Sequence, residues 1–372
     1  MKILLLAGGA RAGIDLFQSL LDGHEQILQF PGVIYINNEL EKILSHKSKK
    51  KIAQTFIKQY PIFFDSRKKS RERHYMLGVK KNNFYKVNKK KFTQRFINFS
   101  KKEIFYKNDK LFQNFYLLHK AYNFNYDKSQ KKILVINAHI IPFVINFKKL
   151  FRDIDYDIIH TIRHPLSSIS STVKNWLKYK NGIDLTPREL FYNLDLVFFG
   201  PDKLKKLNKN IYVVQLEKLH QNVNSVMKCF CQIYNLKFLS SLKESTYHKL
   251  KWWGDIISRN DLNGVNKNFK TSYDLKLFKN KDLFYIKNLM KKKLIKYNYK
   301  IEVTKKYFIH FMPLKCELIV WKNTIKNKKI KHILSIPYFY LKRILIFNKI
   351  FIKDIVLPKS ILLNKKTIIL KK

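Results

Sequence analysis

Residues 1–29, MKILLLAGGARAGIDLFQSLLDGHEQILQ, decide the predicted fold. Residues 3–7 are an apolar run of strand length, and a glycine-rich segment at residues 8–13 interrupts it. Apolar residues then recur at helical spacing from Leu16 onward. The pattern predicts a strand, a glycine loop and a helix in succession. Such a loop directs backbone N–H groups at one point, which is typical of an anion site.

Arg11 adds a positive charge to this loop. A Walker loop ends in Lys followed by Ser or Thr, and this loop has neither residue, which disfavours a magnesium-dependent nucleoside triphosphatase. The dinucleotide-binding fingerprint fails as well. The loop alone is equally consistent with an anion site and with an ordinary strand-to-helix turn, so a second motif is needed to distinguish them.

The composition is strongly basic. The 372 residues carry a net charge of +49, from 75 basic and 26 acidic side chains. Such a charge suggests nucleic acid as a partner. The lysines are spread evenly among many Asn, Ile, Phe and Tyr residues, as in an AT-rich coding sequence, so nucleic acid is disfavoured. Anionic small molecules, acidic glycans and anionic lipid surfaces are equally compatible with the charge.

The three cysteines form no Cys-x-x-Cys pair and no zinc spacing with His, which favours a reducing compartment. They are Cys229, Cys231 and Cys316. Cys229 and Cys231 lie on a helical pattern and are expected to be packing residues. The apolar run at the amino terminus is not expected to be a signal peptide. No uncharged run reaches the roughly 18–20 residues of a spanning helix. We expect a cytoplasmic protein, and contact with the inner face of a membrane stays open.

The rest of the chain alternates between predicted strands and helices. Residues 33–36 are a short strand or a loop. Residues 46–130, with helical pieces at 52–60 and 111–121, predict an insertion that either forms a substrate-specific surface or merely covers one face of a sheet. Apolar strands are then predicted at residues 133–137, 158–163 and 211–215, and helices at 140–151, 165–180 and 224–234.

This alternation predicts βαβ units, hence a three-layer α/β/α fold with a mostly parallel sheet. Ligands bind at the carboxyl ends of the strands in such sheets, where Gly13, His139 and Arg163 would meet. Arg163 ends a strand, and Ser171 lies about two turns into the next helix. An arginine and a serine placed in this way can hold a phosphate from two sides.

The two motifs together resemble the sulfotransferases that use 3′-phosphoadenosine-5′-phosphosulfate. In that family a loop of the form Arg/Lys-Ser-Gly-Thr binds the 5′-phosphosulfate, and Arg-x-Pro followed by Ser at this spacing binds the 3′-phosphate. The resemblance implies that the donor is bound by two groups of residues, Arg11, Ala12, Gly13, Ile14 and Asp15 in the loop, and Arg163 and Ser171 beyond it.

Two further stretches carry the resemblance. Residues 136–142, INAHIIP, look like the His-x-x-Pro that holds the catalytic histidine in one branch of the family, which implies His139 as the base. Residues 213–219, VVQLEKL, look like the family's strand that ends in Glu-x-Leu. Glu217 is expected to hold the strand end or to pair with a loop lysine.

The resemblance covers about residues 1–45 and 131–238. It implies a P-loop-like sulfotransferase domain over residues 1–300, with a helical insertion at about 46–130. A basic, aromatic C-terminal extension follows at 301–372. In this extension, residues 333–356 predict either an amphipathic surface helix drawn to anionic lipid or elements packed on the domain. Pro337 is expected to interrupt any single long helix.

The implied activity is transfer of a sulfuryl group to an acceptor hydroxyl, most plausibly on a carbohydrate or a glycolipid, with Arg11 stabilising charge and no metal required. The alternative is a polyanion- or nucleic-acid-binding protein on a degenerate sulfotransferase-like fold. A P-loop-like kinase would need a magnesium site, which the sequence does not offer.

The loop departs from the family pattern. Ala12 and Ile14 replace a serine and a threonine, which removes side-chain hydrogen bonds of about 0.5–1.5 kcal/mol each. Asp15 would repel a phosphate unless it caps the helix. A tryptophan pair, Trp252 and Trp253, is expected either to stack a sugar or to fill the core.

Overall fold

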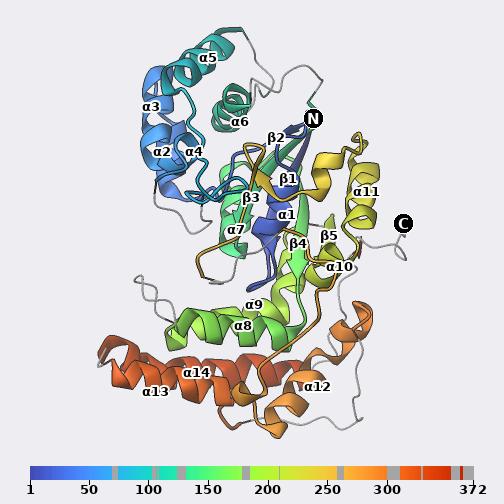
Figure 1. The fold of residues 1–372 in the computed structure, drawn as a ribbon. Coiled ribbons are helices and arrows are strands. Elements are labelled where there is room, and N and C mark those ends of the chain that lie inside the picture. Colours follow the sequence, from blue (N-terminus) through green and yellow to red (C-terminus); the bar gives the residue numbers. More distant parts are fainter. Residues whose placement is uncertain are drawn as a thin grey trace.

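The computed structural model describes residues 1–68, 74–102, 106, 109–123, 131–177, 185–208, 210–257, 264–299, 311–327, 330–352 and 361–362. Within them a parallel sheet lies between layers of helices (Figure 1). The predicted α/β architecture with a mostly parallel sheet is therefore confirmed.

The sheet has the strand order β2-β3-β1-β4-β5-β8, and every neighbouring pair is parallel. Its strands are β1 (Lys2–Gly8), β2 (Ile27–Leu28), β3 (Ile133–His139), β4 (Asp157–Ile162), β5 (Ile211–Gln215) and β8 (Ile361–Leu362). Four of the predicted strands appear as β1, β3, β4 and β5. Residues 33–36 form no strand.

Strand β1 lies between β3 and β4, and this position determines where the functional loop emerges. Ala7 is opposite His139 on one side, and Gly8 is opposite Thr161 on the other. The loop after β1 therefore leaves the same sheet edge at which β3 ends with His139 and β4 leads into Arg163. These elements therefore meet at one edge, as the order of strands and helices in the sequence predicts.

Each face of the sheet is covered by its own helices, because Leu4 and Leu6 point to one side and Leu5 and Ala7 to the other. One layer holds α1 (Ile14–Leu20), α10 (Leu216–Gln221) and α11 (Val223–Tyr234), beside the short hairpin β6 (Thr246–Tyr247) and β7 (Leu250–Lys251) and the 3₁₀ helix η2 (Ser240–Lys243). The other holds α7 (Ile141–Leu150) with α2 (Asn38–Leu44), α3 (Lys49–Gln59), α4 (Pro61–Phe64), α5 (Lys89–Lys102) and α6 (Lys110–Tyr122).

The helices α3 to α6 belong to the predicted insertion, and they cover one face of the sheet. Their interior is aromatic: Phe30 stacks on Phe63 with the ring centroids 5.1 Å apart, and Phe56 packs against both rings. This core is continuous with Leu5 of β1. The covering role is thus confirmed, and a substrate-specific role for the insertion stays a prediction.

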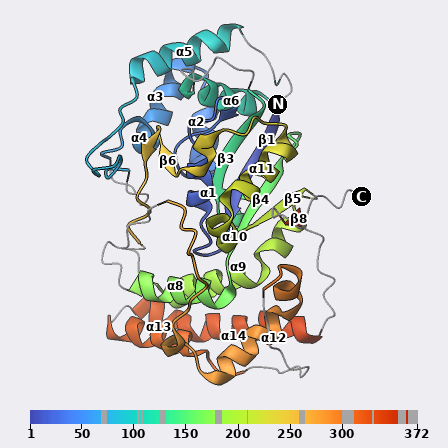
Figure 2. The ribbon, with the colours of Figure 1, turned by 45° about the vertical axis from the view of Figure 1, so that its right-hand side comes forward.

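A further helical layer, besides the two that cover the faces, lies beneath the carboxyl edge of the sheet (Figure 2). It contains α8 (Pro165–Leu177), α9 (Pro187–Lys205), α12 (Asn280–Lys296), α13 (Lys315–Lys326), α14 (Ile330–Ile352) and the 3₁₀ helix η3 (Leu275–Leu277), and these elements share one apolar cluster. The helix predicted at 165–180 ends at Leu177, and residues 178–184 lie outside the described part of the chain.

The predicted interruption at Pro337 is wrong, because α14 runs from Ile330 to Ile352 with Pro337 inside it. A proline removes one helical hydrogen bond, and tertiary packing on both sides of it can offset that loss. Here Phe339 and Phe347 pack against Phe191 of α9. Arg343, fully buried, joins α14 to α13 through Glu317 at 3.2 Å.

Cys229 and Cys231 have the predicted packing role. Cys231 and Cys316 are buried, Cys229 is half-buried, and all three are free thiols. Among the described residues, no helix is both long and apolar enough to cross a bilayer.

Candidate active site

The loop after β1 is fixed by close backbone contacts. The Gly9 N–H donates to the Thr161 carbonyl at 2.7 Å, and a Cβ on Gly9 would lie 3.2 Å from that oxygen. At Gly13 φ is +79°, and a Cβ would come within 2.4 Å of Leu216 Cδ1. A side chain at Gly9 would be crowded, and one at Gly13 would be strained by the positive φ, so both positions favour glycine.

The side chains of Ala12 and Ile14 point into the core, with 2% and 4% of their surface exposed. Both are apolar, so neither can hydrogen-bond a ligand. At this loop Ala12, Gly13 and Ile14 offer a ligand only their backbone. Arg11 is the long polar side chain of the loop, and it carries the contacts described next.

Arg11 links the loop to two distant parts of the chain. Its Nη1 lies 2.8 Å from Asp255 Oδ2. Its Nε donates to Ser171 Oγ at 3.5 Å, and that hydroxyl also accepts from Asn175 Nδ2 at 3.1 Å. The Ser171 hydroxyl is thus turned toward Arg11, so the two sequence motifs meet. Asp255 was not among the predicted site residues.

Arg163 directly follows β4 and is partly buried. Its Nε is inaccessible to solvent and has no hydrogen-bond acceptor among the described residues. Burial lowers the pKa of this guanidinium, although the nearby Glu217 acts in the opposite direction. The guanidinium carbon lies 5.7 Å from the centre of the Phe269 ring. A buried donor without an acceptor is costly, and an anion would satisfy it.

Glu217 braces this strand end. One carboxylate oxygen accepts from the His164 N–H at 2.9 Å, and the other accepts from the Tyr299 hydroxyl at 2.9 Å. The predicted structural role of Glu217 at the strand end is confirmed.

His139, the last residue of β3, has a left-handed backbone with φ +61°. The register between β1 and β3 shifts at this point. His139 Nδ1 lies 3.6 Å from Asp15 Oδ1, and 39% of the His139 side chain is exposed. A non-glycine residue in this backbone region costs about 1–3 kcal/mol, and such residues cluster at functional sites.

Asp15 does not cap α1, because this helix has no side-chain cap hydrogen bond. The carboxylate instead faces His139 and accepts from Asn137 Nδ2 at 3.3 Å. Asn137 also donates to Gln18 Oε1 at 2.7 Å, and Gln18 Nε2 donates to the Phe30 carbonyl at 2.8 Å. This buried amide chain fixes the position of the carboxylate.

The pKa of the Asp15 carboxyl group is lowered from its ordinary value. Burial alone would raise the pKa of its carboxyl group, but His139, the Asn137 hydrogen bond and the charge of Arg11 together lower that pKa below 3.8. A carboxylate therefore faces Nδ1 of a partly exposed imidazole. Such a pair can orient a histidine as a proton acceptor and stabilise the positive charge that it acquires.

The two tryptophans of the pair have different surroundings. Trp252 is 2% exposed and packs edge-on against Tyr247, so it fills the core. Trp253 donates from Nε1 to the Gly78 carbonyl at 2.7 Å, and the ammonium groups of Lys81 and Lys251 lie over its ring.

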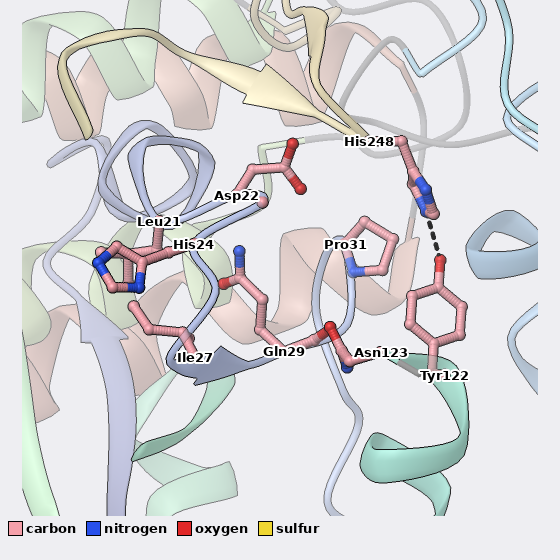
Figure 3. A pocket seen from close by; sticks show the side chains of 10 residues that line it. Leu21, Asp22, His24, Ile27, Gln29, Pro31, Tyr122, Asn123 and His248 are labelled. Atoms are coloured by element: carbon pink, nitrogen blue, oxygen red, sulfur yellow. Dashed lines mark hydrogen bonds between the residues drawn. The ribbon is translucent and has the colours of Figure 1, made fainter. Parts of the chain in front are cut away.

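A small cavity lies beside the turn between α1 and β2 (Figure 3). Its volume is about 20 Å³, enough for about one water molecule. Both amide atoms of Gln29 are buried there without a hydrogen-bond partner among the described residues. Nearby, the Tyr122 hydroxyl and His248 Nε2 lie 2.6 Å apart. None of the predicted site residues lines this cavity, which is too small for a nucleotide.

Comparison with known proteins gave matches only among solved structures. Searches of protein-family models and of curated proteins found no match. The chain is similar to the sulfotransferase domain of the Synechococcus PCC 7002 olefin synthase, with 12% identity over 81% of this chain and 96% of that one, at a TM-score of 0.44. The sulfotransferase domain from the curacin biosynthetic pathway matches at 13% identity over 81% and 99%, also at 0.44.

The sulfotransferase STF9 from Mycobacterium avium matches at 9% identity, over 82% of this chain and 78% of that one, at a TM-score of 0.40. Each of these three proteins is described as a sulfotransferase or a sulfotransferase domain. The functional argument therefore rests on the residues of the site.

Proposed function

We propose that this protein is a sulfotransferase that moves a sulfuryl group from 3′-phosphoadenosine-5′-phosphosulfate to a hydroxyl of a carbohydrate or a glycolipid. The observation that carries the proposal is the contact between Arg11 and Ser171. Two motifs 160 residues apart in sequence meet at one sheet edge, and the buried, unsatisfied Nε of Arg163 supports the same site.

The donor carries phosphate groups, and the charges of the site suit them. Arg11 and the loop backbone of Ala12, Gly13, Ile14 and Asp15 would hold the phosphosulfate, and Arg163 with Ser171 would hold the 3′-phosphate. Two carboxylates lie close by. Asp15 is paired with His139, and Asp255 is paired with Arg11, so Arg11 would exchange Asp255 for the donor anion.

His139 is proposed as the general base. Its Nε2 edge would take the proton of the acceptor hydroxyl, while Asp15 holds Nδ1 and stabilises the imidazolium that forms. When bound, the donor supplies the sulfuryl group and a nucleotide leaving group. Arg11 would stabilise negative charge that develops beside the loop.

Transfer of labelled sulfate from the donor to a panel of glycans and glycolipids tests this proposal. The His139→Ala variant should transfer label about two to four orders of magnitude more slowly, because it lacks the base, while it still binds nucleotide. His332→Ala, on α14, is the matched control and should keep full activity. Equal transfer by the His139→Ala variant and the wild-type protein would remove His139 from the mechanism.

A failure of every acceptor to receive label would leave the polyanion-binding alternative. That alternative predicts binding of nucleic acid or heparin with a steep salt dependence, unaffected by Arg11→Ala or Arg163→Ala.

A further inference from the structure

The outer face of α14 is a continuous apolar stripe. Five large apolar side chains follow one another at intervals of 4, 4, 3 and 4 residues, which keeps them within about 80° of the helix circumference. They are Ile330 (72% exposed), Leu334 (72%), Tyr338 (58%), Leu341 (57%) and Leu345 (70%), and are called the outer stripe below.

The opposite face of α14 packs against α9 and α13. Phe339 and Phe347 contact Phe191 of α9, and Arg343 is fully buried against α13. The helix is therefore held in place by its inner face, and the outer stripe takes no part in the apolar cluster beneath the sheet. Contiguous exposed apolar surface of this kind marks a binding surface.

Helices α13 and α14, called the helical hairpin below, and the residues just before α13 present further exposed apolar side chains. Phe311 and Met312 are 60% and 67% exposed and are held beside α14, because their carbonyls accept from Tyr340 and Arg343. On α13, Ile325 is 54% exposed. The apolar character thus extends beyond a single helix.

The charge of this hairpin identifies the partner. In residues 311–348 the only acidic residue is Glu317, which is buried and paired with Arg343. Lysines of the same helices add positive charge, with Lys315, Lys322 and Lys326 on α13 and Lys331 and Lys342 on α14. A second copy of this chain would bring two like-charged hairpins together, whereas an anionic lipid surface offers both acyl chains and neutralising headgroups.

We propose that the outer stripe of α14 docks on an anionic membrane surface. The helix lies in the plane of the interface, with the outer stripe among the acyl chains and the lysines at the headgroups. The inference does not depend on the proposed sulfuryl transfer.

Flotation of the full-length protein tests this proposal, with vesicles of phosphatidylcholine alone and of phosphatidylcholine mixed with phosphatidylserine. Wild-type protein should float with the mixed vesicles and lose binding at high salt. The triple variant Leu334→Glu, Leu341→Glu, Leu345→Glu should bind about a thousandfold more weakly, because each buried leucine contributes about tenfold. Its circular dichroism should match the wild type, since the replaced side chains are exposed.

The matched control replaces two exposed apolar residues elsewhere, Val79 and Leu275, which are 79% and 62% exposed. Val79→Glu with Leu275→Glu should leave flotation unchanged. Equal binding by the triple variant and the wild type would overturn the proposal. The proposal would also be overturned if the wild-type protein bound no vesicles but formed a dimer in solution that the triple variant abolishes. The outer stripe would then bind a second copy of the chain.

Discussion

Three buried histidines should make this fold sensitive to acid. His74, His119 and His160 are each 0% exposed. Burial lowers the pKa of His74 and of His119 to about 3, and that of His160 to about 4. All three are therefore neutral in the folded protein, whereas in the unfolded chain they titrate near pH 6.5.

The direction of the effect follows from these pKa values. Below about pH 6.5 the unfolded chain binds more protons than the folded protein, so the free energy of unfolding falls as the pH falls toward 3–4. At about pH 5 each histidine removes about 2 kcal/mol relative to about pH 7.5, hence about 6 kcal/mol for the three together. A typical domain has only about 5–15 kcal/mol to lose.

Urea unfolding at about pH 7.5 and about pH 5 measures this loss. In the His119→Gln variant the pH-dependent loss should shrink by about 2 kcal/mol, whatever the variant's stability at neutral pH. A glutamine can keep a hydrogen bond to the Phe115 carbonyl, which lies 2.9 Å from His119 Nδ1. His332→Gln, which removes a histidine outside the core, is the control. An unfolding free energy that does not change between the two pH values would refute this account.

Three further predictions concern the candidate site. Asp15→Asn should lower the transfer rate about 5- to 30-fold, because a charge pair at 3.6 Å with a partly exposed partner is worth about 1–2 kcal/mol. Single-turnover kinetics measures the change. An unchanged rate would show that the pair of Asp15 and His139 plays no part in transfer. Gly13→Ala should lower the unfolding free energy by about 1–3 kcal/mol, because the new Cβ meets a positive φ and a close contact with Leu216. Urea denaturation measures this loss, and an unchanged unfolding free energy would contradict the prediction. Asp255→Asn should tighten nucleotide binding by up to about fivefold, since Arg11 no longer gives up an ion pair; weaker binding in calorimetry would contradict the exchange.

Most of the sheet can be predicted from the sequence, because its strands are short apolar runs bounded by turn residues. The helices beneath its carboxyl edge are harder to predict. Helix α9 has a local signal that the sequence analysis did not use: Thr186 accepts from the Glu189 N–H, and Pro187 occupies the first turn. The continuity of α14 through Pro337 has no local signal, because it depends on packing against α9 and α13.

Some features of the candidate site can likewise be predicted from the local sequence, and others cannot. The loop with Arg11, the strand-end positions of His139 and Arg163, and the helical position of Ser171 follow from local pattern. The partner of Asp15 does not, because helix position alone suggests a cap, whereas the sheet brings His139 from 124 residues away to face the carboxylate. The ion pair of Arg11 with Asp255 spans 244 residues, and no spacing rule predicts it.

The central claim is that Arg163, Ser171 and Arg11 form a site for the donor nucleotide. Calorimetric titration with adenosine 3′,5′-bisphosphate tests it most directly, with Arg163→Ala as the variant, Arg188→Ala on α9 as the control and ATP as the competing ligand. The account predicts saturable one-to-one binding that ATP does not match, which Arg163→Ala loses and Arg188→Ala keeps. No binding, or equal weak binding of every polyanion by all three proteins, would contradict it.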